Sequence, residues 1–240
     1  MSSVTTTRPS LTSNDAAVLQ ALFDAESSPS SGVTIDSTLP AWPATVNISP
    51  EELIALKERE VEIVRELQDT PSHDTVKAAI QKFDSLLKQY PTYPSAYINR
   101  AQALRMLDDA LFTPQAAGIS SQIFADLSKA ITLATPISPA DPVSSVQARL
   151  LADAHTHRGY LLLKAARVQK EVLKDETEHT LPESLANVES DQIEEMASRD
   201  FFFGGRYGNK VAQQLAVQTN PYAKMCGAIV KEAMRKEIHG

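Results

Sequence analysis

Histidine and cysteine are the residues of this chain best suited to bind a metal or to act as a nucleophile. His155 and His157 stand two positions apart, and on a helix such side chains point about 200° from one another, so they cannot share a metal ion. Cys226 lies in an apolar stripe and is expected to be a buried, inert thiol. The other histidines lie in unrelated segments: His73, His179 and His239. The sequence therefore predicts no metal, no cofactor and no catalytic site.

Two short motifs resemble functional sites but stand in the wrong context. Gly204-Gly205-x-x-Gly208 follows an aromatic helix end, whereas a phosphate-binding loop follows a strand. We expect these glycines to stop a helix and to allow close helix packing. Asn47-Ile48-Ser49 matches a glycosylation sequon, but Pro50 follows it and residues 1–10 lack the apolar core of a signal peptide.

Composition limits the kinds of partner. The formal net charge is −7 and no cluster of lysine or arginine is visible, which argues against nucleic acid. No apolar run approaches the roughly 20 residues that span a bilayer, so we expect no membrane association. A single cysteine excludes an internal disulfide and fits a reducing compartment. We expect a cytoplasmic protein, with the nucleus as a further location.

The elements that would position these side chains follow from an internal repeat. Tyr97-x2-Arg100-Ala101-x2-Leu104 is followed 58 residues later by His155-x2-Arg158-Gly159-x2-Leu162. Both segments place a large residue, then a small one, then an apolar one, which is the first-helix pattern of a tetratricopeptide repeat.

The second-helix pattern of that repeat, a small residue four positions before an aromatic one, occurs twice. It appears as Ala79-x3-Phe83 and returns as Ala197-x3-Phe201, and a weaker copy runs Ile123-x3-Leu127-x2-Ala130. Each helix pair cannot bury its apolar face alone and must stack on its neighbours. The sequence therefore predicts an all-α fold, a tetratricopeptide-repeat helical solenoid of about three helix pairs.

The flanking segments divide the chain by composition. We expect a disordered N-terminus, an N-terminal helix, a linker rich in proline and serine, and the solenoid, at residues 1–12, 13–25, 26–48 and 49–238. Ser49-Pro50-x-Glu52 predicts the first helix of the solenoid through a capping serine, a proline at the first helical position and a glutamate reaching back. Trp42, between two prolines of the linker, is expected to anchor that linker on the domain.

Insertions interrupt the repeat near 109–120, 135–145 and 167–190, where the spacing exceeds the repeat pattern by 10, 14 and 26 residues. The last insertion is rich in lysine and glutamate and is expected to form a solvated helix extension or a loop. After Tyr207-Gly208-Asn209 ends the third pair, Asn220-Pro221 is expected to begin a final amphipathic helix that caps the stack.

Three fragments together resemble the tetratricopeptide repeat protein 36 family. Asn14 to Phe23 is similar to its N-terminal helix, Ser95 to Ala103 to its central repeat, and Asn220 to Cys226 to its C-terminal motif. Their order and spacing hold over roughly residues 14 to 236, although the long 167–190 insertion departs from the family. The resemblance implies a non-enzymatic protein linked to seventy-kilodalton heat-shock chaperones and, in animals, to tyrosine catabolism.

The concave surface of such a stack is lined by the first helix of each pair, and a partner is expected to bind there. The predicted groove residues are Ser95, Ile98, Asn99, Gln102, Arg105, Arg65 and His157. In chaperone-binding members of the wider class, an asparagine at the place of Asn99 bonds a peptide backbone or C-terminal carboxylate. Arg105 could add a charge-assisted bond, whereas Asp153 would repel a carboxylate.

Three uses of the groove stay open: capture of a chaperone tail, binding of another partner's helix or extended segment, and a role for Asn99 only in helix contacts inside the repeat. The leading functional hypothesis is an interaction adaptor that binds another protein or peptide. The alternative is a structural subunit or self-associating scaffold that docks through the C-terminal helix.

Overall fold

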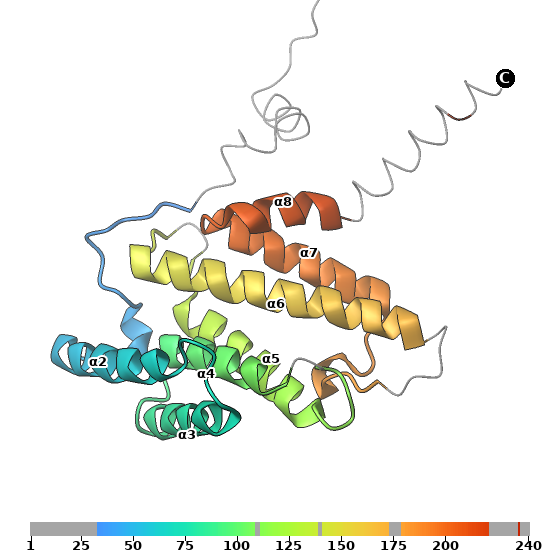
Figure 1. Cartoon of the computed structure of the whole chain (residues 1–240). Helices are drawn as coiled ribbons and strands as arrows, with labels where there is room; N and C mark the ends of the chain where they lie inside the picture. Colours follow the sequence, from blue (N-terminus) through green and yellow to red (C-terminus); the bar gives the residue numbers. More distant parts are fainter. Residues whose placement is uncertain (1–32, 109–110, 139–140, 173–178, 221–234, 236–240) are drawn as a thin grey trace, which may run out of the picture.

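The computed structural model describes residues 33–108, 111–138, 141–172, 179–220 and 235, and the helices between residues 50 and 219 form a stack (Figure 1). The helices are α2 (Pro50–Glu66), α3 (His73–Gln89), α4 (Pro94–Leu107), α5 (Ala117–Ala134), α6 (Ser145–Val172), α7 (Ser190–Arg206) and α8 (Lys210–Thr219), with short 3-10 turns η1 (Ala44–Val46) and η2 (Glu183–Leu185). Within those ranges no strand forms, and a single isolated bridge joins Ile35 to Val143. No described helix is long and apolar enough to cross a membrane.

The capping box predicted at Ser49 is present at the start of α2. The Glu52 backbone N–H donates to Ser49 Oγ at 3.2 Å, and the Ser49 N–H donates to Glu52 Oε2 at 3.0 Å. These two bonds satisfy donors that a helix N-terminus leaves open. Ser72 caps α3 in a similar way, since its Oγ accepts from the Thr75 N–H at 3.1 Å.

Each helix packs against the next one along the chain, from α2 to α8, which is the expected solenoid arrangement. Helices α2 and α3 lie at one end and α7 and α8 at the other (Figure 1). The all-α, paired-helix prediction is confirmed. The pairs are α2/α3, α4/α5 and α6/α7.

An ion pair that recurs between the two helices of each pair fixes the repeat register. Arg100 on α4 binds Asp126 on α5, and Arg158 on α6 binds Asp200 on α7. The first pair carries the same contact with the charges exchanged, between Glu66 on α2 and Lys82 on α3. The partners are separated by 16, 26 and 42 residues, so the second and third pairs contain 10 and 26 residues more than the first. These excesses equal the insertions expected from the sequence.

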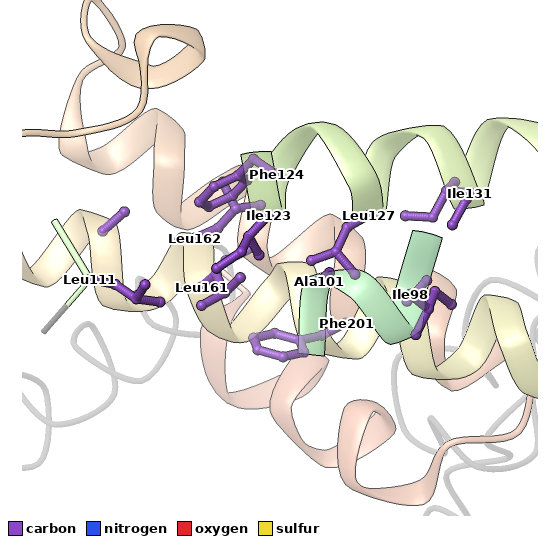
Figure 2. Close-up of a cluster of buried hydrophobic side chains, with 14 of the residues drawn as sticks. Ile98, Ala101, Leu111, Ile123, Phe124, Leu127, Ile131, Leu161, Leu162 and Phe201 are labelled. Carbon is purple, nitrogen blue, oxygen red and sulfur yellow. The ribbon is translucent and has the colours of Figure 1, made fainter. Parts of the chain in front are cut away.

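The predicted repeat positions lie where the helices meet. Figure 2 shows Ala101, Ile123, Leu127 and Phe201 gathered in one apolar cluster. The fully buried repeat residues are Ala79, Phe83, Ala101, Ile123, Leu127, Ala197 and Phe201, with Leu104 at 8% exposure. Gly159 faces the Phe201 ring: a Cβ added there would lie 2.9 Å from Phe201 Cε1. Small residues at these places let the paired helices approach closely.

Two of the insertions fold together as part of the core. Phe112 is fully buried with a positive φ of 76°, and its carbonyl accepts from the Thr180 N–H at 2.8 Å. Leu185 of η2 joins the same cluster of buried side chains. The 109–120 and 167–190 insertions therefore meet, and both contribute buried side chains to the main apolar cluster. Helix α6 itself extends into the second of them as far as Val172.

The segment before α2 crosses back to the third pair. Asp36 N–H donates to the Val143 carbonyl at 2.9 Å, and Ser144 Oγ donates to the Ala41 carbonyl at 2.8 Å. Trp42 packs edge-on to Tyr93 and contacts both apolar clusters, as expected for an anchor. The linker thus ties the start of α6 to the first two helix pairs.

Helix α8 was missed by the sequence analysis, which placed the next helix after Asn220. Asn209 caps α8, since its Oδ1 accepts from the Ala212 N–H at 3.0 Å, and Ala212 is fully buried against α7. The expected N-terminal helix at 13–25 and the capping helix after Asn220 lie outside the described residues.

Candidate functional site

The surface between α4 and α6 carries two of the predicted groove residues in direct contact. Arg105 Nη1 on α4 lies 3.0 Å from His157 Nε2 on α6. Arg105 and Gln102 are both exposed. In the described part of the chain, no carboxylate pairs with Arg105. This contact joins the first helices of two successive pairs and leaves a cation available to a partner.

His157 is held neutral at this contact. Desolvation, reinforced by the positive charge of Arg105, lowers the pKa of His157 to about 4. The neutral ring therefore accepts a hydrogen bond from Arg105 through Nε2. Because the His157 ring is neutral, it adds no second positive charge beside the Arg105 guanidinium.

We expect this histidine to make folding stability pH-dependent. The folded pKa of about 4 lies below the ordinary value of 6.5, so between these values the unfolded state binds more protons. The free energy of unfolding should therefore fall as pH is lowered from about 6.5 to 4. Denaturant unfolding across this window should show the slope, and His157→Gln should reduce it. An unchanged slope in His157→Gln would exclude His157 as its cause.

Asn99 has an internal carboxylate as its partner. Its Nδ2 donates to Glu60 Oε1 on α2 at 2.6 Å, and the Tyr93 hydroxyl donates to Glu60 Oε2 at 2.7 Å. Glu60 is 8% exposed. Burial of the Tyr93 hydroxyl and the negative charge of Glu60 both raise the pKa of Tyr93. In this structure the Asn99 amide thus serves a contact between two successive helix pairs, whereas the sequence suggested a contact inside its own repeat.

The remaining groove residues are scattered. Ser95 is half-buried on α4, and Arg65 is exposed on α2. Ile98 was expected to face away from the core, but it is 7% exposed and belongs to the main apolar cluster, so that placement is wrong. Its side chain packs in the second helix pair because the α4 core face is wider than the repeat pattern alone indicates.

A second site, which sequence reasoning missed, is a pocket of about 730 Å³ between α5, α6, α7 and η2. Its floor holds His155, Arg158 and Asp200. Arg158 donates to Asp200 through Nε at 2.7 Å and Nη2 at 2.8 Å, and His155 Nδ1 lies 2.8 Å from Asp200 Oδ1. Arg158 was visible as the repeat equivalent of Arg100, but its acidic partner lies across the long insertion.

The Asp200 carboxylate is ionised on this floor. Burial acts to raise its pKa, but the hydrogen bonds and charges of Arg158 and His155 outweigh burial, and the pKa is lowered. His155 is 6% exposed, and its ring lies against Phe203 and Tyr207 at centroid distances of 5.2 and 6.1 Å. His155 and His157 leave α6 toward different neighbours, as their spacing predicts.

The glycines of the 204–208 motif are packing residues, as expected. An added Cβ would lie 2.7 Å from Thr156 Oγ1 at Gly204 and 2.7 Å from Gln213 Cγ at Gly205. Gly208 follows α7 with φ of +102°, a conformation suited to glycine at a helix end. Among the described residues, no group of three or more His, Cys, Asp or Glu side chains could hold a metal ion.

Stacked helix pairs with a shared register and an exposed inter-helix surface define a tetratricopeptide-repeat solenoid, a class whose curved surfaces bind other proteins. The chain is 61% identical over 245 residues to the L-tyrosine degradation gene cluster protein hmgX of Aspergillus fumigatus, covering 97% of this chain and 95% of that protein. It is 28% identical over 224 residues to mouse tetratricopeptide repeat protein 36 and 24% identical over 223 residues to a homolog of that protein from Drosophila pseudoobscura pseudoobscura, covering 93% of this chain and 94% of the relative in each case. No family model and no solved structure matches it. The chain belongs to the family that these relatives form, hmgX together with tetratricopeptide repeat protein 36.

Proposed function

We propose that this chain is a non-enzymatic adaptor that binds a partner protein in tyrosine degradation. The helix-pair stack supports the binding role, because such stacks present extended surfaces to peptides and helices. The A. fumigatus relative is identical to this chain at 61% of aligned positions, and its name supports the assignment to tyrosine degradation. A cytoplasmic or nuclear location stays a prediction.

The observation that carries the proposal is the Arg105–His157 contact between α4 and α6. An exposed guanidinium beside a neutral imidazole can form charge-assisted bonds with a carboxylate of a partner. We therefore propose that the partner presents an acidic side chain or a chain terminus to this surface. Gln102, exposed on α4, would supply a neutral hydrogen-bonding group beside it.

A heat-shock chaperone of the seventy-kilodalton class is one proposed partner, and a client protein is the other. The Asn99 amide is bonded to Glu60 in this structure, so it would be available to a chaperone tail only after that bond opens. This geometry favours a partner that uses Arg105 and Gln102 over one that requires a complete carboxylate clamp.

Arg105→Glu should reduce partner recovery about tenfold in affinity purification from native extract, because it replaces an attracting charge by a repelling one. Arg167→Glu, the same exchange at an exposed position of α6, is the matched control and should leave recovery unchanged. Arg65→Glu tests whether the surface extends to α2. Recovery of the same partner by wild type and Arg105→Glu would refute binding at the α4–α6 surface.

A further inference from the structure

The pocket beside α6 is a separate feature from the Arg105 surface. It is lined by α5, α6, α7 and η2, and its volume of about 730 Å³ lies in the usual range for small-molecule sites. Its lining contains no residue of α4, and on α6 it uses His155, Arg158 and Leu162, not His157. The repeat alone does not create this pocket, since η2 belongs to the 167–190 insertion.

The floor of the pocket is a built polar site. Asp200 accepts from both Arg158 and the Nδ1 side of His155, so the ionised carboxylate places the ring proton on Nδ1. In the described part of the chain, no hydrogen bond is made by His155 Nε2. The ring is nine-tenths buried, yet it lines the pocket, which leaves Nε2 as the nitrogen able to bond a ligand.

The walls of the pocket suit a flat apolar body. Phe124 and Leu185 close it from α5 and η2, and Phe203 and Met196 stand along α7. Met196 is 42% exposed, a large apolar side chain left open at the pocket edge. Aromatic rings pack edge-on against phenylalanine and against methionine sulfur, so these walls favour an aromatic group.

The remaining cation of the pocket is Arg199 on α7. It is exposed and lies over the Phe203 ring at 5.9 Å, and no described carboxylate pairs with it. Arg158, by contrast, is neutralised by Asp200. Glu183 on η2 is the one pocket carboxylate outside an ion pair among the described residues. An aromatic group held on Phe203 would bring a carboxylate on the same molecule within the neighbourhood of Arg199.

We propose that this pocket binds a small aromatic carboxylate, with the ring against Phe203 and Met196, the carboxylate on Arg199 and a polar group of the ligand on His155 Nε2. The proposal rests on the proposed role in tyrosine degradation only for the choice of probe molecules. Such a ligand would make the adaptor responsive to an aromatic acid.

The test is binding of 4-hydroxyphenylacetate to the full chain, by ligand-detected NMR and titration calorimetry. The matched analogue 4-methylphenol has the same ring without the carboxylate, and tyrosine has one more carbon in its side chain, which carries an ammonium group. We expect 4-hydroxyphenylacetate to bind with a millimolar or lower dissociation constant and 4-methylphenol to bind at least tenfold more weakly. Tighter binding of tyrosine that is lost in Glu183→Gln would place an ammonium group on Glu183 and identify the amino acid as the preferred form.

Two exposed positions allow the site to be removed without disturbing the core. Arg199→Gln should weaken binding of the acid about tenfold, because a charge-assisted bond is lost, whereas Arg167→Gln should not. Ala125→Trp, on the α5 side of the pocket, should abolish binding by filling it. The proposal would be overturned if wild type bound neither acid. It would also be overturned if Arg199→Gln and Ala125→Trp both bound the acid as tightly as wild type. Arg105→Glu should leave acid binding intact, so a failure of the adaptor surface is separable from a failure of the pocket.

Discussion

Replacing Asp200 by alanine is expected to lower the free energy of unfolding by about 3–5 kcal/mol. Asp200 is 3% exposed and accepts from Arg158 at 2.7 and 2.8 Å and from His155 at 2.8 Å. Without the carboxylate, the Nε and Nη2 donors of Arg158 and the imidazole N–H of His155 lose their acceptor in a largely buried site, and only Nη1 of Arg158 keeps one, Ser128 Oγ at 3.1 Å. Urea unfolding followed by circular dichroism should show a lower midpoint with little change in slope.

Asp191→Ala is the matched control for this substitution. Asp191 also lies on α7 and forms an ion pair, with Lys170 at 2.9 Å, but its side chain is 86% exposed. An exposed pair of this kind contributes about 0–1 kcal/mol, so the control should unfold almost like wild type. Equal destabilisation by the two substitutions would mean that the Arg158–Asp200 contact does not hold α6 and α7 together.

The stabilisation from the Arg158–Asp200 contact should be lost at low pH. Because the pKa of Asp200 is lowered in the folded state, its stabilising contribution is present above the ordinary value of 3.8 and is lost as pH falls through the lower folded pKa. The His157 contribution is lost earlier, between about pH 6.5 and 4. The acid unfolding curve of wild type should therefore show both losses, and Asp200→Ala should retain only the first.

The helix pairs could be predicted from the sequence because the residues that define them lie within one helical turn of each other. Ala79-x3-Phe83 and Ala197-x3-Phe201 place a small and an aromatic residue one helical turn apart, and all four side chains are fully buried. The capping box at Ser49 is equally local and is confirmed atom by atom. The sizes of two insertions were also predictable, since the repeat spacing is fixed by packing and not by loop length.

The contacts between distant segments could not be predicted in the same way. Arg100 and Arg158 stand at equivalent positions, but their acidic partners lie 26 and 42 residues further along. Nothing in a local window shows that the 109–120 and 167–190 insertions pair through Phe112 and Thr180. The pocket is lined by η2 of the 167–190 insertion together with three helices, which is why the sequence did not reveal it.

The groove prediction was limited by the first helix pair. Its register was uncertain in the sequence because the loop at Pro71 separates α2 from α3. The structure places Glu60 of α2 beneath Asn99, so the amide that resembled a peptide-binding group has a partner within the chain. The contact between Glu60 on α2 and Asn99 on α4 can be predicted only when the register of α2 is known.

Gly159→Leu is expected to destabilise the third helix pair by about 1–3 kcal/mol or more, because it forces an overpacked side chain against Phe201. Even a single Cβ would lie 2.9 Å from the ring, which is fully buried and has little room to move. For a domain of this size a loss of about 1–3 kcal/mol should lower the melting temperature by roughly 2–12 °C. A melting temperature equal to that of wild type would mean that α6 and α7 are further apart than the structure places them.

Gly118→Ala separates this packing effect from the loss of a helical glycine. Gly118 is exposed on α5, and a Cβ there meets no described atom within 4 Å. Alanine should therefore stabilise α5 by roughly 0.5–1 kcal/mol through helix propensity alone. Opposite signs at the two positions would show that the requirement for glycine at 159 comes from the helix contact, the same requirement that places Ala101 at the equivalent position of α4. A stabilised Gly159→Leu variant would remove that explanation and the repeat register with it.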